Sequence, residues 1–115
     1  MSLIFVYNAN SGRVNALLDA GHKLFSPSTY PCSLCALTYD TFTENTLWKA
    51  FKQDNKTEMT FYHKDEFERA YPNLKITYPA VLKHEDEQLS IMINQQELEN
   101  FSTVESLIER LRTSL

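Results

Sequence analysis

The sequence predicts a small α/β domain in which helices cover a sheet. Short apolar segments typical of strands alternate with segments whose apolar residues recur at helical spacing. Near the C-terminus a polar turn separates two strand-like segments, which indicates a hairpin before a final helix. Hydrophobic residues make up 43% of the 115 residues, which is enough for a core, so we expect one domain over residues 1–115.

The first third of the chain predicts a strand followed by two helical segments. Residues 3–7 are β-branched and aromatic, and asparagine and serine follow them, which predicts a buried strand that ends in a turn. Apolar residues at helical spacing predict a helix over residues 13–25, which the two prolines of residues 26–31 end. Residues 32–39 are largely apolar and predict a short helix that begins at or near Cys32.

A further helix is predicted directly after this segment. Thr41 and Glu44 have the spacing of a capping box, in which the first residue caps the helix and the second bonds back to it. We expect the helix that they open to bury Leu47, Trp48 and Phe51.

The rest of the chain continues the alternation and ends in the hairpin and a helix. Asp65 is expected to cap a short helix, and Ser102-x-x-Glu105 has the spacing of another capping box. In chain order the predicted elements are a strand over residues 58–63, a helix over 65–70, a strand over 74–83 that Pro79 interrupts, a strand over 89–93 and a helix from Ser102.

Charge and hydropathy exclude several classes of protein. The formal net charge of −4 argues against a nucleic-acid binder, which needs a basic face, and against docking on an anionic membrane. No apolar run approaches the roughly 20 residues that span a bilayer, and no basic segment with an apolar run marks a signal peptide. We therefore expect a cytoplasmic protein, in which a cysteine pair is more often catalytic or metal-binding than structural.

The order β-α-β-α-β-β-α, with a proline at the third strand, resembles the thioredoxin-like fold. In that family the proline is cis and lies against a Cys-x-x-Cys at the start of a helix. The resemblance implies that Pro79 is this proline and that Cys32 and Cys35 are the dithiol. The chain departs from the family because residues 8–12 follow the first strand and the cysteines come later, in an insertion. A contact between Cys32 and Pro79 therefore does not follow from the sequence.

A second resemblance is to a group of short, uncharacterised bacterial proteins, some of which carry the label GTPase. The segments that carry it are Tyr7-Asn8-Ala9, Ser11-Gly12 and residues 26–39, which read SPSTYPCSLCALTY. The chain has no G-x-x-x-x-G-K-[ST] string, and its two glycines cannot form a glycine-rich loop that binds phosphates. We therefore do not expect a GTPase.

The cysteine pair predicts thiol–disulfide exchange. Two thiols at positions i and i+3 of a helix lie on one face, close enough for a disulfide, and the first turn of a helix favours the thiolate of Cys32. On this interpretation Cys32 attacks a protein or small disulfide substrate, and Cys35 resolves the mixed disulfide. Pro79 would guide an extended substrate, and Tyr30 would flank the pair. Electrons would come from a cellular thiol system, so no bound organic cofactor is predicted.

The same spacing leaves two other interpretations open, both of a non-enzymatic domain. Cys-x-x-Cys provides two of the four ligands of tetrahedral zinc, but the three histidines His22, His63 and His84 include no H-x3-5-H pair. A complete zinc site would therefore have to be assembled from distant elements or shared across a dimer. A partner-binding module is the other non-enzymatic alternative. Alternatively, both cysteines are inert packing residues.

Two weaker candidates lie beside predicted strand ends. Asn8, Asn10 and Ser11 follow the first strand, where open α/β sheets often bind ligands, but they also suit an ordinary capped turn. His63 is a candidate proton carrier because histidine as a residue type serves in proton transfer, although a solvated strand end explains it more simply.

Overall fold

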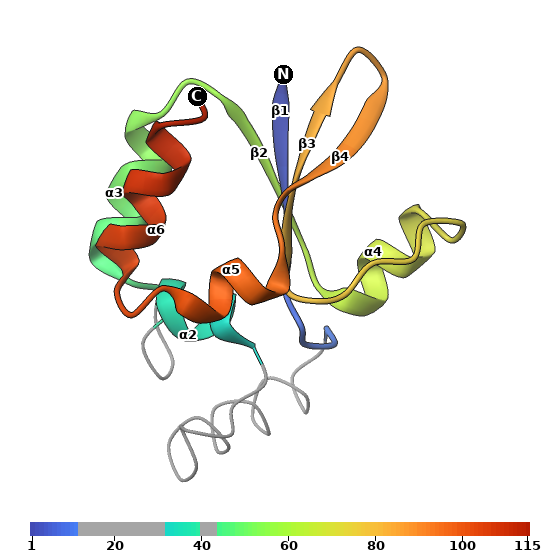
Figure 1. The fold of residues 1–115 in the computed structure, drawn as a ribbon, viewed down its shortest axis with the longest axis horizontal. Helices are drawn as coiled ribbons and strands as arrows, with labels where there is room; N and C mark the ends of the chain where they lie inside the picture. The colour runs from blue at the N-terminus through green and yellow to red at the C-terminus, as the bar shows by residue number, and fades with distance from the viewer. Residues whose placement is uncertain (12–31, 40–43) are drawn as a thin grey trace, which may run out of the picture.

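A four-stranded sheet with helices on both faces organises the chain (Figure 1). The computed structural model describes residues 1–11, 32–39 and 44–115. The α/β class predicted from the sequence is confirmed. The strands are β1 (Ser2–Val6), β2 (Glu58–Tyr62), β3 (Ala80–Glu85) and β4 (Gln88–Ile93), and the helices are α2 (Ser33–Thr38), α3 (Thr46–Asp54), α4 (Lys64–Ala70), α5 (Gln95–Asn100) and α6 (Val104–Arg112).

The strands stand in the order β2-β1-β3-β4, with β1 in the interior of the sheet. β1 runs parallel to β2 and antiparallel to β3, and β3 forms the predicted hairpin with β4. Interior strands with both faces covered are apolar without alternation. This explains why Leu3, Ile4, Phe5 and Val6 are all buried and why the first segment reads as a continuous apolar run.

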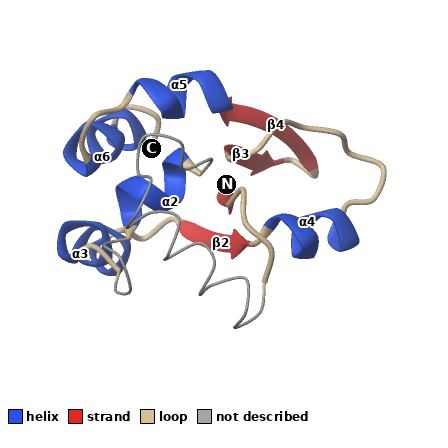
Figure 2. Cartoon of the chain, turned by 90° about the horizontal axis from the view of Figure 1, so that it is seen from below, coloured by secondary structure: helices blue, strands red, loops and turns tan. Residues whose placement is uncertain are grey.

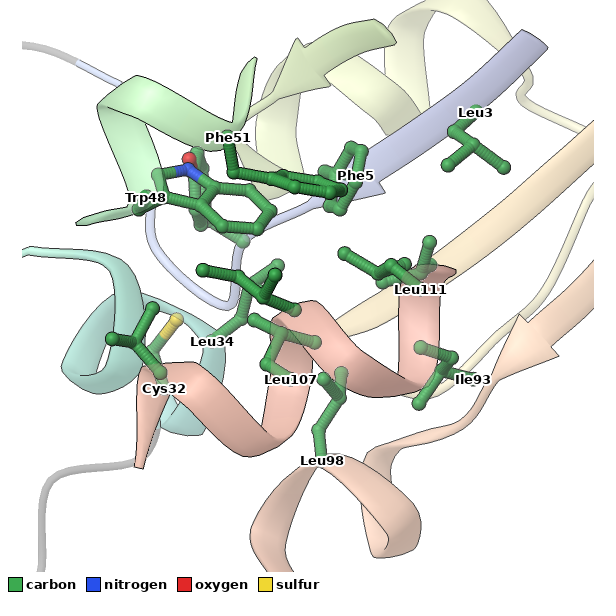
Figure 3. Close-up of a cluster of buried hydrophobic side chains, with 14 residues drawn as sticks. Leu3, Phe5, Cys32, Leu34, Trp48, Phe51, Ile93, Leu98, Leu107 and Leu111 are labelled. Carbon is green, nitrogen blue, oxygen red and sulfur yellow. The ribbon is translucent and has the colours of Figure 1, made fainter. Parts of the chain in front are cut away.

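Successive residues of β1 serve the two faces of the sheet in turn, as the pleat of a strand requires. Leu3 and Phe5 pack against the larger cluster, which contains residues from α2, α3, α5 and α6 (Figure 3). Ile4 and Val6 belong to the smaller cluster on the other face, where Phe67 of α4 is fully buried. Figure 2 shows α4 on one side of the sheet and the other four helices on the opposite side.

The start of α3 differs from the prediction. The structure places the N-cap at Asn45, whose side-chain oxygen accepts hydrogen bonds from the backbone N–H groups of Leu47 (2.9 Å) and Trp48 (3.2 Å). Glu44 instead forms an isolated β-bridge with Tyr39, and the predicted cap Thr41 lies outside the described residues. Because α3 starts later than predicted, different residues of the helix face solvent. Leu47, which was predicted to be buried, is 51% exposed.

The start of α4 also differs, because Asp65 is engaged elsewhere. His63 is the N-cap, and its backbone N–H donates to Glu66 Oε1 at 2.8 Å in a capping box. The carboxylate of Asp65 accepts hydrogen bonds from Ser11, which follows β1. A partner distant in sequence therefore overrides the local capping signal.

Two further differences concern the second half of the chain. The predicted strand over residues 74–83 begins only at Ala80, and Leu74, Ile76 and Tyr78 pack against the smaller cluster from the segment before it. The helix α5 has no counterpart in the prediction, since Leu98 is its only buried residue and gives no apolar period. The terminal helix is confirmed, with Thr103 as its N-cap rather than Ser102.

Candidate functional site

The two cysteines form a disulfide at the start of α2. Cys32 is the N-cap of the helix and Cys35 lies one turn later, with their Cα atoms 5.3 Å apart. The short helix predicted over residues 32–39 is therefore confirmed, as is the prediction that the spacing allows a disulfide. The candidate site is built on this bond.

The disulfide lies against the end of β1, although residues 12–31 separate them in sequence. The backbone N–H of Asn8, which follows the strand, donates to Cys32 Sγ at 3.3 Å. The backbone N–H of Cys35 donates to the same sulfur at 3.2 Å. The cysteines therefore lie beside the end of β1.

Pro79 lies at the same end of the sheet. It is buried, directly precedes β3 and follows a cis peptide bond from Tyr78, as the family resemblance implies. Because Val6 pairs with Ala80 in the antiparallel register, Pro79 stands beside the residue that continues β1 toward Asn8. The structure therefore brings Cys32, Cys35 and Pro79 to one end of the sheet.

Aromatic rings gather near this end, and of those named here only His63 was a candidate from the sequence. The Tyr7 ring lies edge-on to the ring of Tyr39, with centroids 6.2 Å apart, and 5.9 Å from the ring of His63. Burial raises the pKa of the Tyr7 hydroxyl well above its usual value, with a smaller contribution from Tyr39, so this hydroxyl stays protonated. Tyr30, the predicted neighbour of the cysteines, lies outside the described residues.

His63 has a structural partner. The Nδ1 atom of His63 lies 2.8 Å from Glu66 Oε1. His63 is the N-cap of α4 and connects this helix to the end of β2. The backbone N–H of His63 is the main cause of a lowered Glu66 pKa, followed by the His63 side chain. These contacts give His63 a structural role as the N-cap of α4.

Ser11 links the turn after β1 to the start of α4 through hydrogen bonds. Its backbone N–H and hydroxyl donate to the two carboxylate oxygens of Asp65 at 2.9 and 2.6 Å, and Arg69 lies 3.8 Å from the same carboxylate. The hydroxyl of Ser11, then its backbone N–H, lower the pKa of Asp65 below its usual value. Ser11 was singled out in the sequence, and its role here is to hold the turn that leads away from the site.

This link predicts a pH-dependent contribution to stability. A carboxyl whose pKa is lowered by folding stabilises the protein above its unfolded pKa, and this contribution is lost as pH falls through the folded pKa. Asp65→Asn should therefore lower the free energy of unfolding at neutral pH, and the difference from wild type should shrink below about pH 4. Urea unfolding across a pH series measures it.

Asp86→Asn provides the matched control for this experiment. Asp86 is exposed, in a turn at a positive φ of 53°, a conformation that asparagine also tolerates. Its replacement should leave the pH profile of stability close to that of wild type. Equal profiles for Asp65→Asn and wild type would show that the Ser11–Asp65 contact does not stabilise the fold.

The described residues do not assemble a metal centre or a membrane span. Across residues 1–11, 32–39 and 44–115 there is no group of three His, Cys, Asp or Glu side chains that could hold a metal ion. His22, one of the three histidines considered for zinc, lies outside these residues. Within the same part of the chain, no helix has the length and apolar character needed to cross a bilayer.

Comparison with known proteins assigns no family to the chain. No protein-family model, curated protein or solved structure matches it. The functional argument therefore rests on the residues and geometry of the disulfide site.

Proposed function

We propose that this protein is a thiol–disulfide oxidoreductase that acts through Cys32 and Cys35. The observation that carries the proposal is the disulfide between them at the start of α2, beside the end of β1. A pair that closes within one helical turn can pass between dithiol and disulfide with little rearrangement of the backbone. Each cycle moves two electrons between the pair and a disulfide substrate.

The arrangement of the site supports a thioredoxin-like assignment of the fold. A parallel pair of strands, an antiparallel hairpin and Pro79 before β3 stand together with a Cys-x-x-Cys at the start of a helix. These are the features on which the family resemblance depends. The insertion between β1 and the cysteines leaves Cys32 beside the end of β1, because the backbone N–H of Asn8 donates to Cys32 Sγ.

Pro79 is the third residue of the proposed site. A proline has no backbone N–H and a fixed φ, so it fixes the direction of the backbone where β3 begins. We assign it the role of guiding an extended segment of a disulfide substrate past the cysteines. The electrons come from cytoplasmic thiols, and no organic cofactor is needed for this exchange.

A redox titration tests the proposal. The protein is equilibrated across ratios of reduced to oxidised glutathione, free thiols are alkylated, and the mass of the protein counts them. We expect a reversible change of two thiols with a midpoint between about −270 and −180 mV, the range of dithiol catalysts. A variant with serine at both cysteines provides the baseline.

The competing interpretations give different results in the same experiment. Thiols that stay reduced at every ratio, or that never react, would mean an inert packing pair. Thiols that react only after a chelator is added would mean a metal site. Either result would exclude the proposed oxidoreductase.

A further inference from the structure

The two sulfur atoms of the disulfide lie in different environments. Cys32 is only 1% exposed and belongs to the larger core cluster, where Figure 3 places it beside Leu34. Cys35 is partly buried and packs against the edge of that cluster. An external thiolate must reach a sulfur along the axis of the S–S bond, so access favours the sulfur nearer the surface.

Cys32 Sγ also accepts hydrogen bonds. Two backbone N–H groups from separate segments, those of Asn8 and Cys35, donate to Cys32 Sγ at 3.3 and 3.2 Å. When the disulfide is opened by attack on the other sulfur, Cys32 is left with the electron pair and a negative charge. Burial alone would disfavour that charge, whereas preformed donors aimed at the sulfur stabilise it. A stabilised thiolate is the better leaving group.

We propose that exchange proceeds through Cys35, with Cys32 as the leaving and resolving sulfur. This inference rests on the proposed function and deepens it. An external thiolate of the glutathione class attacks Cys35 Sγ, a new S–S bond joins the two, and the Cys32–Cys35 bond breaks with its electron pair on Cys32. A second external thiolate then attacks the mixed disulfide, releasing the external disulfide and the Cys35 thiolate.

In the opposite direction the same two roles apply. The Cys35 thiolate attacks one sulfur of a substrate disulfide, and the new S–S bond joins Cys35 to the substrate as a mixed disulfide. The other substrate sulfur leaves as a thiolate. The Cys32 thiolate then attacks Cys35 Sγ, restores the internal disulfide and releases the second substrate thiolate. Two electrons pass from the protein to the substrate, and the two released thiolates take up protons from water.

This assignment is opposite to the one that the sequence predicts. Sequence position suggested that Cys32, at the start of the helix, is the attacking thiolate. Position in the chain does not say which sulfur faces the core, and here the first cysteine is the buried one. The hydrogen bond from Asn8 spans 24 positions and has no local sequence signal.

Trapping the mixed disulfide tests the polarity. Native Cys32→Ser and Cys35→Ser variants are treated with glutathione disulfide, and adduct formation is followed by mass spectrometry. We expect Cys32→Ser, which keeps Cys35, to form the adduct about tenfold or more faster than Cys35→Ser. In urea the two rates should converge, which shows that the difference depends on the fold. A faster adduct on Cys35→Ser would overturn the inference.

Wild-type protein gives an independent measurement if a variant fails to fold. The oxidised protein is exposed briefly to reduced glutathione, quenched with acid, and sequenced by tandem mass spectrometry to locate the adduct. An adduct on Cys35 supports the inference, and one on Cys32 overturns it while the proposed function stands. If the wild-type disulfide does not exchange with glutathione at all, both proposals fail together.

Discussion

Replacing either cysteine with serine is expected to abolish catalysed reduction of insulin disulfides by dithiothreitol. With Cys32→Ser the mixed disulfide has no internal thiol to resolve it, and with Cys35→Ser the sulfur that meets the substrate is absent. The disulfide closes a loop of only a few residues, so its loss restores little conformational entropy to the unfolded chain. Turnover should therefore fall to the uncatalysed rate while circular dichroism stays native.

Ser33→Ala is the matched control, because it changes one of the two residues between the cysteines and leaves both sulfur atoms in place. The Ser33 hydroxyl oxygen is buried and has no hydrogen-bond partner among the described residues. Removing an unpartnered buried hydroxyl is neutral or stabilising, so this variant should keep both turnover and stability. Wild-type turnover in either cysteine variant would contradict the proposed mechanism.

Much of the sheet could be predicted because its strands carry strong local patterns. The continuous apolar run of β1 requires both faces to be covered, and the polar turn between β3 and β4 indicates a hairpin. Strand order could not be predicted in this way, because it depends on which strands pair across long separations in sequence. The pairing of Val6 with Ala80 has no signal in either segment alone.

Helix starts were harder to predict, since several nearby residues can serve as caps. Asn45 and His63 cap α3 and α4, whereas capping patterns alone favour Thr41 and Asp65. In the case of Asp65 a distant partner, Ser11, takes the carboxylate that a local signal assigned to the cap. Tertiary contacts of this kind override local preference.

The candidate site was predicted in its residues but not in its geometry. The spacing of Cys32 and Cys35 shows that they can form a disulfide, and Pro79 stands out by its place before a strand. That all three lie at the end of β1 depends on where the chain returns after residues 12–31, which spacing does not reveal. Burial of Cys32 follows from the helices that cover this face, α5 and α6 among them.

The site also depends on Leu34, which lies between the two cysteines in sequence and anchors α2 in the core. Leu34 is fully buried in the larger cluster with Leu107 and Leu98. Leu34→Ala is expected to lower the free energy of unfolding by about 2–5 kcal/mol, the cost of deleting a buried leucine and leaving a cavity. This is a large part of the roughly 5–15 kcal/mol that stabilises a small domain. Urea unfolding of the oxidised protein measures the loss.

Leu47→Ala is a closely matched control, because both leucines are the second residue of their helices and the change in helix propensity is the same. Leu47 is 51% exposed, so its replacement should change stability by no more than about 0.5 kcal/mol. In the reduced protein, Leu34→Ala should also speed alkylation of Cys32, since loss of the anchor favours local opening of α2. Equal destabilisation by the two changes would contradict the burial of Leu34. It would also contradict the inference that the packing of Leu34 holds Cys32 away from solvent.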